Sequence, residues 1–443
     1  MAFTKTVSGS VPMSRTPVRD ALESALALAS TDRAAHVFTR LLPVQARVEA
    51  DAADARRRAG ISLGPLDGMI VSVKDLFDMA GEVTSAGSKI FRDAGAAAAD
   101  APVVARMRRA GAVLIGRTSM SEFAFSGLGL NPHWGNPGNA ADSRRAPGGS
   151  TSGGAVSVAL GIARLTLGTD TGGSTRIPAA FNGIVGFKPT SHRIPRAGVF
   201  PLSYALDSVG PLGVNVAECA AADAIMANEE PLSLPVLPLA GLRVGVPRGL
   251  LFEDVEGVVA LAFEAGLVAL TKAGVQIVEI DIDDLVRGMR DVLSLAPIAA
   301  CEAAEIHRDY LEARAGDFDR RVLARIRPGA GVPAPAYVRA LRHREALKQV
   351  FAGRIAHFDA LAWPTTPIVA PEIAPLEADD SVFAATNVLA LRNTSPCNFF
   401  DVPALSLPLP VNGLPVGFML MGAPGSDRRL LSTGAAAEAA LAR

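Results

Sequence analysis

Hydrophobic positions recur at helical intervals in the first part of the chain. Residues 19–29 and 34–58 both have this spacing, and the second segment carries acidic and basic residues beside a stripe of alanine, valine and leucine. A helix buries such a stripe against other elements and keeps its charged side in water. The pattern therefore predicts two helices in an N-terminal helical layer, within residues 1–64.

After residue 64 the pattern changes to short apolar runs that alternate with helical stretches. Such runs are typical of strands, and we expect them at residues 69–73, 112–115, 165–167, 243–246 and 275–280. A helix is expected at 101–110, two strands around the turn Asn412-Gly413 within 405–420, and a closing helix at 427–443. This alternation predicts an α/β fold with a mixed sheet.

The composition allows a large buried core. Hydrophobic residues make up 49% of the 443 positions, a length that permits two or three domains or one large α/β unit. The 43 basic and 44 acidic residues give a net charge of −1. This balance lacks the basic surface that binds nucleic acid or an anionic membrane, and it suits a small neutral substrate.

The cysteines are isolated from one another. Cys219, Cys301 and Cys397 include no Cys-x-x-Cys pair, which indicates reduced, buried thiols rather than a disulfide or zinc framework. The N-terminal region has no apolar stretch of signal-peptide length, and no segment is typical of a membrane span. We therefore expect a cytoplasmic protein.

Lys74 stands at the end of the predicted strand at 69–73, and only six of the 43 basic residues are lysines. A lysine that loses its water on burial can become neutral and act as a general base, whereas arginine stays protonated. The alternative is that Lys74 pairs with its neighbour Asp75 and has a structural role.

Two serines lie in glycine-rich settings, Ser150 in Gly148-Gly149-Ser150-Thr151-Ser152-Gly153 and Ser174 in Thr171-Gly172-Gly173-Ser174. Glycine beside a serine indicates a backbone that approaches something closely. The backbone N–H groups of the second segment, Thr171, Gly172, Gly173 and Ser174, could form an oxyanion hole. Taken alone, the first segment is more often a flexible or phosphate-facing loop, although no GxxxxGK[ST] motif accompanies it. Together with Lys74, the two serines predict a Ser/Ser/Lys hydrolase.

The segments GMIVSVKD, PGGSTSGG, GTDTGGSTR and GFKPT, in this order, resemble the amidase signature family of Ser-cisSer-Lys hydrolases. Ser150 and Ser174 are 24 positions apart, which is the family's separation, and the resemblance covers residues 66–421. One departure is visible, because the family's usual Gly-Gly-Ser-Ser-Gly-Gly is replaced here by Gly-Gly-Ser-Thr-Ser-Gly at 148–153. The resemblance implies a single large domain, residues 1–443, with a central mixed β-sheet covered by helices on both faces. Within it, residues 65–443 would form the core and 68–190 the catalytic segment.

The resemblance also implies a role for each site residue. Neutral Lys74 would take a proton from Ser150, which follows a cis peptide bond, and Ser150 would take one from Ser174, the nucleophile that forms an acyl-enzyme. Asp170 and Arg176 would hold the loop through a buried ion pair. Phe125 and Ser126 would line the acyl pocket, with a variable pocket wall at about 285–335.

Histidine chemistry is the rival mechanism, since six histidines are present. Neither serine has a G-x-S-x-G elbow, and no S-x-x-K occurs. His133 lies in a turn-rich segment that favours a structural role, and His307 would either border the pocket or face solvent on a helix. The histidine spacing gives no metal site, so we expect neither a metal nor a cofactor.

The predicted function is hydrolysis of a carboxylic or urea-type amide to an acid and ammonia or an amine. The alternative is a glutamine-hydrolysing amidase subunit of a tRNA-dependent amidotransferase, which needs a companion protein. The third possibility is a non-catalytic binding protein with the same fold. The expected partner is a small amide substrate, without direct contact to nucleic acid or membrane, and a homodimer is possible.

Overall fold

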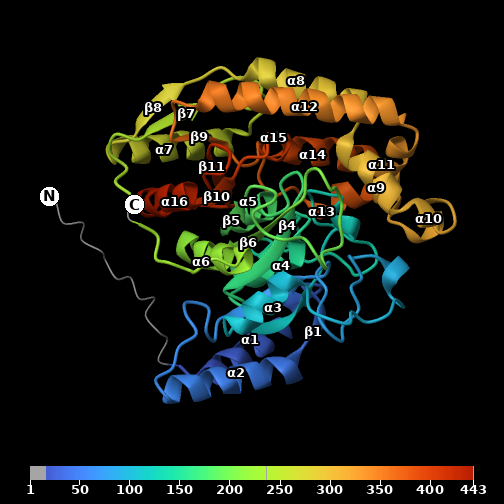
Figure 1. Ribbon diagram of the computed structural model, residues 1–443, viewed down its shortest axis with the longest axis vertical. Helices are drawn as coiled ribbons and strands as arrows, with labels where there is room; N and C mark the ends of the chain where they lie inside the picture. Colours follow the sequence, from blue (N-terminus) through green and yellow to red (C-terminus); the bar gives the residue numbers. More distant parts are fainter. Residues whose placement is uncertain (1–15, 236, 443) are drawn as a thin grey trace.

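Eleven strands form one mixed sheet in the part of the chain that the computed structural model describes, residues 16–235 and 237–442. Figure 1 shows α1 (Val18–Ala29) and α2 (Pro43–Arg58) at one end of the molecule. At the opposite end lie α8 (Asp283–Leu295) and α12 (Ala334–Ile355) (Figure 1). The sheet passes through the region between these two helical layers.

The strand order is β1-β3-β2-β4-β6-β5-β10-β11-β9-β7-β8. Parallel pairs join β2 to β3 and β4, and β7 to β8 and β9, while the other neighbours are antiparallel. The strands are β1 (Phe38–Leu41), β2 (Ile70–Lys74), β3 (Val113–Thr118), β4 (Leu165–Asp170), β5 (Val185–Lys188), β6 (Ser208–Gly213), β7 (Arg243–Val246), β8 (Gln276–Glu279), β9 (Ala360–Pro364), β10 (Ala404–Leu409) and β11 (Val416–Met421).

The other helices connect these strands or extend the layers. They are α3 (Pro102–Arg109), α4 (Ser152–Ala159), α5 (Arg176–Asn182), α6 (Val216–Ala227), α7 (Gly257–Lys272), α9 (Ile298–Ile306), α10 (Arg308–Leu311), α11 (Arg320–Ala330), α13 (Ile373–Ala378), α14 (Asp380–Arg392), α15 (Ser395–Phe399) and α16 (Asp427–Leu441). Short 3₁₀ helices occupy Asp32–Ala34, Lys89–Phe91, Glu122–Ala124 and Ala315–Asp317.

Both faces of the sheet are covered by helices, as expected. In β3, Leu114 packs into a cluster with α3, α6, α9 and α11, whereas Val113 and Ile115 pack with α1, α2 and α4. In β11, Phe418 likewise packs toward α7 and α16, and Met419 toward α8 and α12. Because successive strand residues point to opposite faces, this division places helices on each side of the sheet. The predicted α/β fold, a single large domain with a mixed sheet, is therefore confirmed.

The short apolar runs are strands where the sequence predicts them. β2, β3, β4, β7 and β8 coincide with the five expected runs, and β10 and β11 pair antiparallel around the Asn412-Gly413 turn. The expected helices at 19–29, 101–110 and 427–443 correspond to α1, α3 and α16, although position 443 lies outside the described residues. Four further strands, β1, β5, β6 and β9, were not predicted.

The prediction of one helix over 34–58 is wrong in its first part. Residues Phe38–Leu41 form β1, which pairs antiparallel with β3, and the helix begins only at Pro43. Proline fits the first turn of a helix because its missing N–H has no partner there, and it keeps the preceding residue out of helical conformation. Leu42 accordingly has φ −119° and ψ 52°. The N-terminal layer thus contributes a strand to the sheet as well as two helices.

Two of the three cysteines are buried as expected, and Cys301 is not. Cys219 and Cys397 are buried, Cys301 is half-buried, and none of the three forms a disulfide. Within residues 16–235 and 237–442, none of the helices combines the length and the apolar character needed to cross a membrane.

His307 neither borders the cavity described below nor faces solvent, so both expectations for it are wrong. It follows α9 and is fully buried, with its ring 4.1 Å from that of Phe123 and 5.7 Å from those of Phe200 and Phe318. Neither ring nitrogen has a hydrogen-bond partner among the described residues. Burial lowers the pKa of His307 to about 4, because an imidazolium would lose its hydration inside the aromatic cluster.

We expect His307 to make the protein less stable in acid. Its pKa in the folded protein lies below the ordinary value of 6.5, so only the unfolded chain binds the proton as the pH falls from 6.5 toward 4. The free energy of unfolding should fall by roughly 2–3 kcal/mol between pH 8 and pH 4.5 through this residue alone. His307→Leu should remove that part of the pH dependence, measured by urea unfolding at both pH values.

His357 is exposed and serves as the control, so His357→Leu should leave the pH dependence as in the wild type. Equal acid sensitivity of the His307→Leu variant and the wild type would contradict this role of the buried imidazole.

Candidate active site

Lys74 is the last residue of β2, in the interior of the sheet between β3 and β4. Its side chain is 0% exposed, and Nζ donates hydrogen bonds to Ser150 Oγ at 2.8 Å and to Thr169 Oγ1 at 2.9 Å. Asp75 instead forms a buried ion pair with Arg117. The structural alternative for Lys74, pairing with its neighbour, is therefore wrong.

The buried position changes the charge state of Lys74. Desolvation lowers its pKa to about 7, against the opposing attraction of the Asp170 and Asp207 carboxylates. Near neutral pH a large fraction of Lys74 is therefore uncharged and able to accept a proton.

Ser150 follows a cis peptide bond, Gly149–Ser150, as the resemblance implies. Its side chain is fully buried, and Gly149 N donates to Gly127 O at 2.8 Å. A Cβ on Gly149 would lie 2.6 Å from Gly129 N, a contact that real Cβ atoms do not make. Only glycine therefore fits at position 149, and the close packing fixes the loop that points Ser150 at Lys74.

Ser174 lies on the loop between β4 and α5 and is 4% exposed at a cavity. Gly173, which precedes it, has φ 145°, and a Cβ there would lie 2.2 Å from Thr394 Oγ1. In the part of the chain that the structure describes, Ser174 Oγ and Ser150 Oγ are not hydrogen-bonded to each other. The structure thus brings Lys74 and Ser150 into contact and places Ser174 at the cavity.

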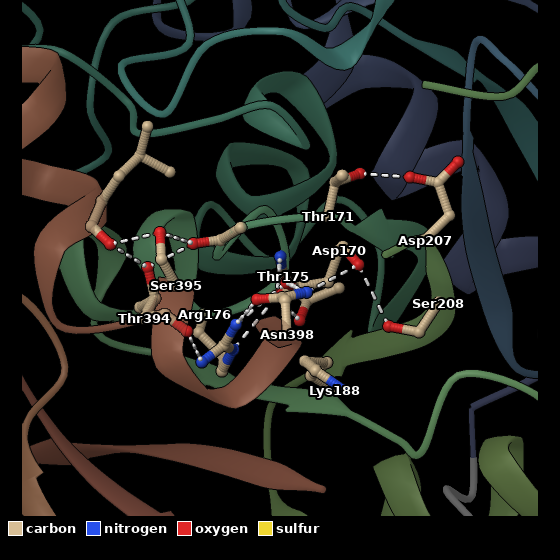
Figure 2. Close-up of polar contacts among 12 residues, drawn as sticks. Asp170, Thr171, Thr175, Arg176, Lys188, Asp207, Ser208, Thr394, Ser395 and Asn398 are labelled. Carbon is tan, nitrogen blue, oxygen red and sulfur yellow. Dashed lines mark hydrogen bonds and ion pairs between the residues drawn. The ribbon is translucent and has the colours of Figure 1, made fainter. Parts of the chain in front are cut away.

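Asp170 and Arg176 form the ion pair that the resemblance implies (Figure 2). Both side chains are 0% exposed. Arg176 donates from Nη2 to Asp170 Oδ1 at 2.9 Å and from Nε to Oδ2 at 3.1 Å. Asp170 Oδ2 also accepts from Thr175 N and Thr175 Oγ1. Although burial alone would raise the pKa of Asp170, the Arg176 charge holds it well below its usual range.

The ion pair is tied to the C-terminal part of the chain. Arg176 donates to Thr394 O at 2.9 Å and to Asn398 Oδ1 at 2.7 Å, and Asn398 Nδ2 donates to Asp170 Oδ1 (Figure 2). The loop that carries Thr171 to Ser174 is therefore held at both ends by a fully bonded network.

The cavity beside Ser174 has a volume of about 300 Å³. Phe125 and Ser126 line it, together with Thr171, Gly172 and Ser174. The expected variable wall at 285–335 also contributes lining residues, among them Leu293, Ile298, Ala300 and Arg325. None of the lining residues within the described chain is a histidine.

His133 has the structural role that its segment favours. Its Nε2 lies 2.8 Å from Glu122 Oε1, and its backbone N–H donates to Asn131 Oδ1. A histidine-based mechanism therefore has no geometric support at the cavity.

Three residues at the site were not predicted from the sequence. Thr169 contacts Lys74, and its place one position before the recognised Asp170 could have indicated it. Asp207 is buried and accepts from Thr171 Oγ1 at 2.5 Å, as Figure 2 shows, and from the backbone N–H groups of Leu202 and Ser203. Arg325 is one of many arginines, and no sequence signal distinguishes it.

The chain has an α/β fold in which buried Lys74 contacts one serine and a second serine lies at a small cavity. This arrangement places the protein in the class of hydrolases. Residues 20–431 match the family described as Amidase, and the chain belongs to this family.

Relatives of known name support this assignment. A 2-amino-5-chloromuconic acid deaminase of Comamonas testosteroni is 38% identical over 406 residues, 89% of this chain and 86% of the relative. A 1-carboxybiuret hydrolase subunit of Pseudomonas sp. (strain ADP) is 36% identical over 439 residues, 95% and 94% of the two chains. A glutamyl-tRNA(Gln) amidotransferase subunit of Symbiobacterium thermophilum is 35% identical over 446 residues, 92% and 90%.

The fold agrees with a crystal structure described as an amidase. That structure superposes with a TM-score of 0.86 at 34% identity and covers 96% of this chain and 97% of its own. The chain is therefore a hydrolase of the amidase family that acts on carbon–nitrogen bonds other than peptide bonds, as the sequence predicts.

Removing one partner of the Asp170–Arg176 pair should be strongly destabilising. Arg176→Met leaves a buried carboxylate without its cation, which costs about 3–5 kcal/mol in comparable cases. Adding Asp170→Asn should restore part of that loss, because the remaining amide carries no charge. Urea unfolding of the wild type, the single variant and the double variant measures both effects.

The exposed pair of Arg320 with Asp380 gives a matched control, and Arg320→Met should change the free energy of unfolding little. If Arg176→Met were as mild as Arg320→Met, the buried pair would not hold the loop.

Proposed function

We propose that the protein hydrolyses a small amide through a Ser174 acyl-enzyme, with Lys74 and Ser150 as a proton relay. The observation that carries this proposal is the 2.8 Å contact between Lys74 Nζ and Ser150 Oγ in a fully buried setting. A lysine whose pKa burial lowers to about 7 is suited to general-base catalysis near neutral pH.

The contacts of Lys74 fit the neutral amine. A neutral amine has two N–H groups and one lone pair, so one N–H can keep the bond to Thr169 Oγ1. The bond from Nζ to Ser150 Oγ then reverses, and the lone pair accepts the Ser150 proton. Ser150 Oγ then takes the proton of Ser174 Oγ, which attacks the amide carbonyl. A carbon–oxygen bond forms, the carbon–nitrogen bond breaks, and the relay returns the proton to the leaving nitrogen. Water repeats the cycle on the acyl-enzyme and releases the acid.

The negative charge that develops on the carbonyl oxygen needs donors. The backbone N–H groups of Thr171, Gly172, Gly173 and Ser174 are the proposed oxyanion hole, and one such donor contributes about 3–4 kcal/mol. Because two of the four residues are glycines, no side chain there blocks the approach of the carbonyl oxygen to these N–H groups. The Asp170–Arg176 pair supports this role by fixing the loop before the reaction starts.

The substrate is a small carboxylic or urea-type amide. A cavity of about 300 Å³ has the size of a small-molecule site, and the names of two relatives denote a muconic acid deaminase and a carboxybiuret hydrolase. The acyl part of the substrate would lie against Phe125 and Ser126.

The cytoplasmic location and a homodimer remain predictions.

A second candidate function is the glutamine-hydrolysing subunit of a tRNA-dependent amidotransferase, favoured by the 35% identity to such a subunit. This function requires a companion protein. Copurification from the native host and glutaminase activity of the isolated chain distinguish the two candidates.

We expect Ser174→Ala to abolish amide hydrolysis while the chain stays folded. The nucleophile carries the chemistry, so the rate should fall by several orders of magnitude, whereas losing one hydroxyl should change stability by no more than about 1 kcal/mol. Ammonia release and thermal unfolding measure the two effects. A fluorophosphonate should label Ser174, and an adduct on Ser150 would reverse the assigned roles of the two serines.

The pH dependence should report Lys74. Its neutral form is the active one, so kcat/KM should rise as the pH increases through about 7 and level off above it. Lys74→Arg keeps the positive charge but cannot accept a proton, and it should lose roughly 10²–10⁴-fold in kcat/KM.

Lys89→Arg is the matched control, because Lys89 is partly exposed and pairs with Asp317, and it should keep wild-type activity. The lysine mechanism would be contradicted if Lys74→Arg kept substantial activity and one of six single His→Ala variants lost it. That result would indicate a histidine mechanism instead.

A further inference from the structure

Helix α7, residues Gly257–Lys272, is apolar on nearly all of its sides. Its inner side packs into the hydrophobic core beside α16 (Figure 1). Its outer side is apolar too, with Leu261 75% exposed and Val268 52% exposed. Glu264 and Lys272 are the only charged residues in the sequence of this helix. Because a helix that is apolar all round is typical of a buried position, the outer side of α7 is suited to contact with another protein surface.

Five exposed residues of α7 form one continuous stripe, here called the α7 stripe, which consists of Val258, Leu261, Ala265, Val268 and Lys272. Successive members are three, four, three and four positions apart. This is the spacing of the two apolar positions of a heptad, through which two helices pack along a seam. In the part of the chain that the structure describes, the stripe is exposed, so the second helix of such a seam must come from another molecule.

The α7 stripe is complementary to a second copy of itself when the two helices run antiparallel. A twofold axis at Ala265 places Leu261 of one copy against Val268 of the other, because the two residues lie on opposite sides of the axis at nearly equal spacing. The small side chain of Ala265 at the axis allows the helices to approach closely. Each contact of a twofold interface occurs twice, so the one stripe supplies both sides of the interface.

The charges at the two ends of the stripe fit the same arrangement. Lys272 is the last residue of α7, Glu256 immediately precedes its first residue, and both are exposed. In the antiparallel pair, Lys272 of each copy lies beside Glu256 of the other, and two ion pairs form. Neither residue has an ion-pair partner among the described residues. Glu264, beside the stripe, is already paired with Arg248, so its two copies near the axis repel each other little.

We propose that α7 is the contact surface of a homodimer in which the α7 stripes of two copies pack antiparallel. The net charge of −1 does not oppose this association, because two such chains repel each other little. The cavity of Ser174 has no lining residue from α7, so the dimer does not depend on the proposed function.

The mass of the purified full chain in solution tests this interface, measured by sedimentation velocity over a dilution series. The wild type should have the mass of two chains at the higher concentrations. Leu261→Glu places a charge in the apolar seam, so the dissociation constant of the dimer should rise at least roughly 30-fold, as for a central interface residue. Val268→Glu should have the same effect.

Val350 on α12 provides the matched control, because it is 51% exposed, like Val268 at 52%. Val350→Glu should dimerise as the wild type does. Circular dichroism should show that all of these variants are folded, since each substituted side chain is exposed.

Charge reversal tests the antiparallel arrangement. Lys272→Glu and Glu256→Lys should each weaken the dimer roughly tenfold, because each change gives two like-charged contacts in place of two ion pairs. An equimolar mixture of the two variants should dimerise as strongly as the wild type, because opposite charges then meet at both ends of the seam.

A wild type that stays monomeric over the whole series would overturn the proposal, and so would a dimer that Leu261→Glu and Val268→Glu leave intact. If the mixture of the two charge variants did not recover, the antiparallel packing would be wrong. A companion protein that copurifies with the wild type from the native host, but not with Leu261→Glu, would show that the second copy is the wrong occupant if the chain alone is monomeric.

Discussion

The buried ion pair between Asp170 and Arg176 is the interaction on which the site depends. It joins the end of β4 to the start of α5 and so spans the loop that carries Ser174. The attraction between two buried charges offsets their loss of hydration only where every remaining donor and acceptor is hydrogen-bonded. The bonds of this pair to Thr175 and Asn398 supply those partners. The loop geometry is therefore fixed in the free protein, before a substrate binds.

Burial has three different consequences for the basic residues of the site. Arg176 forms an ion pair with a carboxylate and stays charged. Lys74 forms hydrogen bonds only with hydroxyl groups, and burial lowers its pKa to about 7. Arg325 is only partly buried and forms no ion pair with the described residues, and its pKa falls only to about 10, so it stays charged. Loss of water thus leaves Arg176 as a paired cation, Lys74 as a lysine that can lose its charge near neutral pH, and Arg325 as a cation without a carboxylate partner among the described residues.

Much of this organisation could be predicted from the sequence where a short motif determines the structure. Strands such as β2 and β4 are contiguous apolar runs, and Lys74, Ser150 and Ser174 lie in short segments with recognisable spacing. β1 was missed because its four residues adjoin an alanine-rich helix, and only pairing with β3 makes them a strand. The positions of Asp207 and Arg325 depend on which distant segments pack together. The residues next to them in the sequence do not indicate that packing.

The contacts of Arg176 also determine when the site can exist. Its partners Thr394 and Asn398 are 218 and 222 positions further along the chain. During synthesis, the segment with Ser174 leaves the ribosome long before these partners are made, and contacts between distant segments form late in folding. A nascent or truncated chain that lacks α15 therefore has both serines but not the network that orders them. The ordered loop around Ser174 can therefore form only when nearly the whole polypeptide is present.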